Sequence, residues 1–144
     1  MATGRRGWLA SALGVGLALR WPTAGAAGPS HPQARWMAEA VRMRALAESW
    51  GDQSYGAVVV AGDRVIGLGP SRVVKDRDGD AHAERVAIRD ALQRHGTTAL
   101  EGAVMYSTSR PCAACERVAA HAGIARMIHG EALIDAGAPR PAHP

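Results

Sequence analysis

Apolar and polar positions recur along the chain with two different spacings. Between residues 32 and 50 the apolar side chains follow helical spacing, which predicts an amphipathic helix. Residues 55–61 form a short apolar run, and Gly62-Asp63 is typical of a two-residue turn. Residues 64–69 are therefore expected to form the returning strand of a hairpin.

The later half of the chain alternates helical and strand patterns. The pattern predicts a loop over 70–81, a helix over 81–94, a strand over 103–109, a helix ending near 122 and a strand over 124–129. A hairpin followed by strand–helix–strand crossovers gives a mixed sheet covered by helices. The sequence thus predicts an α/β fold with three layers (α/β/α) and a mixed central sheet.

The first 27 residues have a different character from the rest. Arg5 and Arg6 precede an apolar segment of 12 residues, and the small residues 24–27 follow it. This is the pattern of a secretory signal, and the segment is shorter than the about 20 residues of a membrane-spanning helix. Adjacent arginines are similar to the bacterial twin-arginine signal. We expect a signal peptide over 1–27 and a periplasmic or secreted mature protein without a membrane anchor.

Composition and charge limit the remaining possibilities. The 144 residues fit one domain, expected over 28–135, and a tail rich in small residues and proline, 136–144, is expected to be disordered. Without Arg5, Arg6 and Arg20 the chain has 14 basic and 13 acidic side chains, so no nucleic-acid partner is expected. The 17 glycines and the lack of phenylalanine predict closely packed helices.

Two short motifs carry the candidate chemistry. His82-Ala83-Glu84 opens one predicted helix, and Cys112 and Cys115, three residues apart, share one face at the start of the next. A helix N-terminus stabilises the thiolates that bind zinc. Three protein ligands with room for one water are typical of a catalytic zinc site. The motifs therefore predict a Zn²⁺ site formed by His82, Cys112 and Cys115.

Glu84 follows His82 by two residues. On a helix this spacing turns its carboxylate about 200° away from the imidazole, so the two side chains are not expected to bind one ion alike. We interpret Glu84 as the catalytic residue that carries protons for a water at the site.

The two motifs, with Pro111 before the first cysteine, resemble the signature of the cytidine deaminase-like superfamily. The pattern is most similar to the branch that holds guanine, cytosine and tRNA adenosine deaminases, and the resemblance covers about residues 32–131. It implies hydrolytic release of ammonia from a purine or pyrimidine base or nucleoside, with guanine as the first substrate to test. A small-molecule substrate, zinc and a homodimer are compatible with it.

The resemblance also implies substrate contacts by position. Ser71 stands where the branch often has a base-recognising Asn. By the same resemblance, the backbone N–H of Ala83 is expected to contact the base, and that of Cys112 is expected to help hold the attacking oxygen. Arg110 stands where many members have Glu. Little room follows Glu131 for a further strand and helix, so the C-terminal elements are expected to be shortened.

Two other functions fit the same residues. One is an exported redox protein that uses Cys112 and Cys115 as a dithiol, and the other is a catalytically inactive binding protein with a deaminase fold. His95, His121 and His129 are expected to play no part in metal binding.

Overall fold

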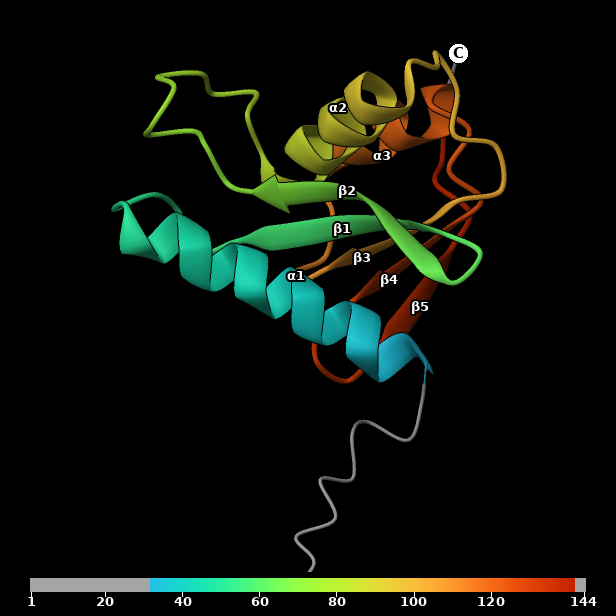
Figure 1. The fold of residues 1–144 in the computed structure, drawn as a ribbon, viewed down its shortest axis with the longest axis horizontal. Helices are drawn as coiled ribbons and strands as arrows, with labels where there is room; N and C mark the ends of the chain where they lie inside the picture. The colour runs from blue at the N-terminus through green and yellow to red at the C-terminus, as the bar shows by residue number, and fades with distance from the viewer. Residues whose placement is uncertain (1–31, 142–144) are drawn as a thin grey trace, which may run out of the picture.

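A five-stranded mixed sheet forms the centre of the computed structural model, which describes residues 32–141 (Figure 1). The elements, in chain order, are α1 (Pro32–Ser49), β1 (Gly56–Ala61), β2 (Arg64–Pro70), α2 (Ala83–His95), β3 (Val104–Ser107), α3 (Ala113–His121), β4 (Arg126–His129) and β5 (Ile134–Gly137). Helix α1 covers one face of the sheet, and α2 and α3 lie together on the other face. The predicted three-layer α/β/α fold is confirmed.

The strands lie in the order β2-β1-β3-β4-β5. Strand β1 is antiparallel to both β2 and β3, whereas β3 and β4 are parallel, so the sheet is mixed as predicted. The segment after β2 leads to the start of α2, and the segment after β3 leads to the start of α3. This connection pattern brings the N-termini of the two helices to one side of the sheet, where the site lies.

The two faces of β1 supply two separate cores. Ala57 and Val59 pack with the residues of α2 and α3, whereas Val58 and Val60 pack with those of α1. Successive side chains of a strand point to opposite faces, so an uninterrupted apolar run is what a strand buried on both faces requires. The apolar run at 55–61 predicted a strand of a hairpin, and the structure shows that this strand is also buried on both faces, since four of its valines and alanines are fully or almost fully buried.

Helix α2 lies unusually close to β2 because glycine faces it twice. A Cβ atom on Gly69 would lie 2.1 Å from the carbonyl oxygen of Ala83, and one on Gly67 would lie 2.2 Å from that of Ala87. Only glycine allows the backbone of the strand to approach the helix at this distance. The composition predicted close packing between helices, whereas the close approach observed here is between α2 and β2, and it fixes the depth of the first turn of α2.

The C-terminal end differs from the prediction. Ala136 and Gly137, expected in the disordered tail, belong to β5, which pairs antiparallel with β4 after a turn in which the Leu133 N–H donates to the Gly130 carbonyl. Three of the four β5 residues are exposed, so the strand has no apolar alternation that a sequence pattern could reveal. Beyond it, Arg140 forms an ion pair with Glu116 of α3 (3.0 Å). No helix follows β5 within the described residues.

The expected signal peptide, 1–27, lies outside the described residues. Of the helices between residues 32 and 141, none combines the length and the apolar character needed to cross a membrane.

The contact between β2 and α2 makes a stability prediction. Gly69→Ala should lower the free energy of unfolding by about 2 kcal/mol or more, because its methyl group would overlap the backbone of Ala83. Gly79→Ala is the matched control, since nothing lies within 4 Å of a Cβ there, and it should change stability by less than about 0.5 kcal/mol. Urea unfolding of both variants measures the difference, and equal stabilities would contradict the packing described.

Candidate metal centre

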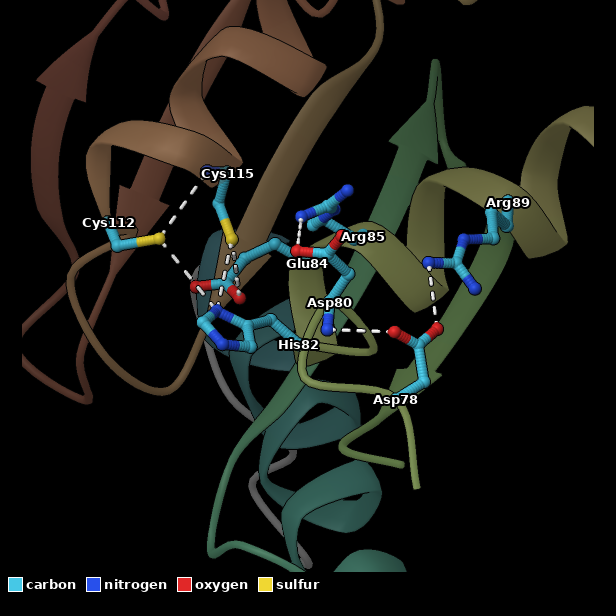
Figure 2. Close-up of polar contacts among 8 residues, drawn as sticks. All are labelled: Asp78, Asp80, His82, Glu84, Arg85, Arg89, Cys112 and Cys115. Atoms are coloured by element: carbon cyan, nitrogen blue, oxygen red, sulfur yellow. Dashed lines mark hydrogen bonds and ion pairs between the residues drawn. The ribbon is translucent and has the colours of Figure 1, made fainter. Parts of the chain in front are cut away.

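The three predicted ligands lie at the starts of two neighbouring helices (Figure 2). His82 is the N-cap residue of α2, in an extended conformation, and Cys112 is the N-cap residue of α3. Cys115 lies in the first turn of α3, and its N–H donates to the Cys112 sulfur (3.4 Å). The cap therefore holds the two cysteines in a fixed relation, and positive helix ends lie beside both sulfurs.

The donor atoms of these residues converge. His82 Nδ1 lies 3.5 Å from Cys115 Sγ and 3.8 Å from Cys112 Sγ, and all three atoms lie within 4.8 Å of one another. Zinc bonds of about 2.3 Å to sulfur and about 2.05 Å to nitrogen, at a tetrahedral angle, place nitrogen and sulfur roughly 3.6 Å apart. The residues thus fit zinc in both chemistry and spacing, and the predicted convergence is confirmed.

The surroundings of Cys115 make ionisation of its thiol depend on a nearby positive charge. Its side chain is fully buried, and burial raises the pKa of the Cys115 thiol far above its ordinary range, with the charge of Glu84 adding to the effect. A buried thiol ionises when a cation neutralises it, and thiolate is the form that binds metal. Zinc at this position supplies that cation.

Ion pairs fix the loop that precedes His82. Asp78 pairs with Arg89 (3.6 Å) and Asp80 pairs with Arg85, both arginines belonging to α2 (Figure 2). Asp78 and Asp80, at the end of this loop, are thus held against the helix that follows. They restrain the approach of the chain to His82.

Glu84 lies beside the ligands without belonging to their group. Its Oε2 lies 3.6 Å from Cys115 Sγ, and the residue is only 6% exposed. The helical angle argued from sequence does not apply, because α2 begins at Ala83 and not at residue 81, so His82 is not helical. Imidazole and carboxylate both face the same centre (Figure 2).

Burial raises the pKa of Glu84 above its ordinary range, opposed in part by its own backbone N–H and by the Cys115 thiol. A carboxyl group whose pKa is raised toward neutrality is suited to accept and return a proton. The environment of Glu84 therefore suits the proton-carrying role predicted for it.

A cavity of about 230 Å³ opens onto these groups. Its lining residues are Gln53, Tyr55, His82, Ala83, Glu84, Ser109, Arg110 and Cys112. A larger cavity, of about 450 Å³, lies between α1, β2 and α2 and is lined by none of the candidate site residues. The smaller cavity is lined by His82, Cys112 and Glu84, so we take it as the candidate substrate site.

The two predicted substrate contacts have different outcomes. Ala83 lines the cavity, as expected. Ser71 does not: its side chain is fully buried and its hydroxyl donates to Asp52 Oδ1 (2.9 Å). The structure therefore corrects the expectation that Ser71 reaches the substrate, because Asp52, which no sequence pattern linked to it, engages its hydroxyl.

Sequence reasoning missed three lining residues and noted a fourth, Arg110, only as a departure from the family pattern. Gln53 and Tyr55 precede β1, and Ser109 and Arg110 follow β3. These segments belong to no motif with a chemical signature. The one available signal was their place at the ends of neighbouring strands, beside the cysteine motif.

Comparison with known proteins agrees with this geometry. The family model described as the cytidine and deoxycytidylate deaminase zinc-binding region matches residues 30–131. The chain belongs to this deaminase family. It is 30% identical over 106 residues to the tRNA-specific adenosine deaminase of Buchnera aphidicola, an alignment that covers 74% of this chain and 70% of that enzyme.

Solved structures place the fold among deaminases as well. The guanine deaminase of Bacillus subtilis superposes with a TM-score of 0.64 at 27% identity, covering 67% of this chain and 62% of that one. A structure from a study of tRNA:A34 deaminases gives a TM-score of 0.64 at 33% identity, covering 67% and 70%. Zinc is thus the cofactor of this domain, and a dithiol redox protein is not favoured. The homodimer stays a prediction.

The ligand set predicts which substitutions release the metal. His82→Ala, Cys112→Ser and Cys115→Ser should each weaken zinc binding by about 100-fold or more, because each removes a direct ligand. His121→Ala, an exposed histidine on α3, is the matched control and should keep about one zinc ion per chain. Metal analysis after dialysis against a chelator measures this. Full zinc content in all four variants would rule out the assigned ligands.

Proposed function

We propose that the chain is a zinc-dependent hydrolytic deaminase of a free purine or pyrimidine base or its nucleoside. The observation that carries this is the buried carboxylate of Glu84, 3.6 Å from the sulfur of Cys115 and on the wall of the 230 Å³ cavity. Ligand pockets usually measure about 300–1,000 Å³, so this one suits a single small heteroaromatic base. Guanine is our first candidate, supported by the likeness to a guanine deaminase.

The reaction requires water to replace an amino group on a ring carbon. Zinc, when held by His82, Cys112 and Cys115, lowers the pKa of a water molecule and makes it nucleophilic at neutral pH. Glu84 accepts a proton from that water and delivers it to the ring nitrogen beside the reacting carbon. The water oxygen bonds to that carbon, its remaining proton passes through the same carboxylate to the amino group, the carbon–nitrogen bond breaks, and ammonia and the ring carbonyl compound are the products.

Ala83 has a positioning role in this proposal. As the first residue of α2 its N–H has no acceptor within the helix, and the residue lines the cavity. This N–H is free to donate to a ring acceptor and to hold the base beside Glu84. The N–H of Cys112, before the first turn of α3, is proposed to contact the attacking oxygen in the same way.

Substitution of Glu84 tests the chemistry directly. Glu84→Gln should lower kcat for ammonia release by about 10²–10⁴-fold, because the amide cannot accept the proton, while zinc content stays unchanged. Glu39→Gln, on α1, is the control and should leave the rate unchanged. The substrates are guanine, adenine, cytosine, their nucleosides and tRNA. Equal inertness of the wild type and Glu84→Gln on every substrate would refute the enzyme, and ammonia from tRNA alone would refute the substrate class.

We also propose that the mature protein works outside the cytoplasm, as a periplasmic or secreted enzyme. The support is the sequence pattern of residues 1–27. In a bacterial host the wild type should be recovered from the periplasm at a reduced mass, and the variant with Arg5→Lys and Arg6→Lys should stay in the cytoplasm at full mass. Arg20→Lys keeps both leading arginines and serves as the control. Full-length wild type confined to the cytoplasm would contradict export.

A further inference from the structure

The side chain of Gln53 lines the same cavity as that of Glu84. It lies between α1 and β1 and is one of the lining residues. No hydrogen bond joins its carboxamide to another residue between 32 and 141, and the residue is exposed. The amide is therefore available to a molecule that enters the cavity.

The backbone of Gln53 is held on both sides. Its N–H donates to Asp52 Oδ1 (2.7 Å), and its carbonyl accepts from the N–H of Tyr55 (2.7 Å). Asp52 in turn accepts from the N–H groups of Val74 and Lys75 through its other oxygen (2.9 and 2.8 Å). The carboxylate thus ties the segment that carries Gln53 to the loop that leads toward His82.

This arrangement also explains why Ser71 is unavailable. The Ser71 hydroxyl and the Gln53 N–H both donate to the same oxygen of Asp52. Burial opposes ionisation of Asp52, but these hydrogen bonds outweigh it and lower its pKa, so the carboxylate is charged at neutral pH. Asp52 therefore engages the hydroxyl of Ser71, whereas the side chain of the neighbouring residue, Gln53, lines the cavity.

The other polar groups of the cavity have different capabilities. His82, Cys112 and Glu84 serve the metal and the proton transfers, and Arg110 can only donate. The hydroxyls of Tyr55 and Ser109 are single groups that rotate freely. The carboxamide of Gln53 alone presents a donor and an acceptor side by side in one plane.

We infer that Gln53 reads the edge of the substrate ring, selecting rings that carry a carbonyl and an N–H as neighbours. The inference rests on the proposed function and names the substrate class of that site. Cytosine and guanine have such an edge. 4-Aminopyrimidine and 2-aminopurine keep the amino group that leaves but lack the edge, so each is a matched partner of one of these bases.

The test compares preference within these pairs. For the zinc-loaded full chain, kcat/KM for ammonia release is measured on all four compounds, and the preference is the ratio of each base to its partner. Intrinsic reactivity cancels when the ratio of a variant is divided by that of the wild type. Gln53→Met, which keeps the length of the side chain, should lower the preference about tenfold or more, since both hydrogen bonds to a desolvated ring edge are lost. The effect should fall mainly on KM.

Two further variants complete the design. Gln53→Glu keeps the shape but supplies acceptors only at neutral pH, so it should also lower the preference. Gln93→Met makes the same change on an exposed residue of α2 that does not line this cavity, and should leave the ratio as in the wild type.

The outcomes separate this inference from the proposed function. Ammonia release by the wild type, with the same preference in Gln53→Met and Gln53→Glu, overturns the role of Gln53 and leaves the deaminase intact. No ammonia from these four compounds with a wild type that deaminates adenine or a nucleoside overturns the inference alone, and no ammonia from any base or nucleoside, matching Glu84→Gln, overturns both.

Discussion

The approach of one imidazole to two sulfurs is the contact on which the rest of this structure depends. His82 and the cysteines are about thirty residues apart, and they meet because α2 and α3 begin on the same side of the sheet. The depth of α2 is in turn set by Gly67 and Gly69, which let the helix backbone lie against β2. A small change in that distance would move the imidazole of His82 relative to the two sulfurs, and zinc accepts only a narrow range of metal–ligand distances.

The electrostatics of the site follow from this geometry. Two thiolates balance the charge of a divalent ion, which leaves Glu84 as an additional negative group in a buried position. Burial pushes its carboxyl toward the protonated form, and a proton on it removes the excess charge. The same environment that makes the carboxylate costly to bury therefore suits it to hold a proton between the two transfers of a hydrolytic deamination.

Much of this could be predicted from the sequence because it depends on local rules. Apolar spacing located α1, β1, α2 and α3, and the two motifs identified the metal ligands and Glu84 from the residue types that zinc prefers. Strand β5 was not predicted because its side chains are mostly exposed, and only its pairing with β4 makes it a strand. Ser71 was expected at the substrate because its position was judged without Asp52, a partner 19 residues away. Contacts of this kind depend on the folded chain and leave no pattern along it.

The most direct test of the account is the zinc coordination shell, measured by X-ray absorption on the purified zinc-loaded protein. We predict two sulfurs at about 2.3 Å, one imidazole nitrogen at about 2.05 Å and one further light atom. A shell without sulfur, or a Cys112–Cys115 disulfide in protein that retains its metal, would contradict the convergence of His82, Cys112 and Cys115 on one ion.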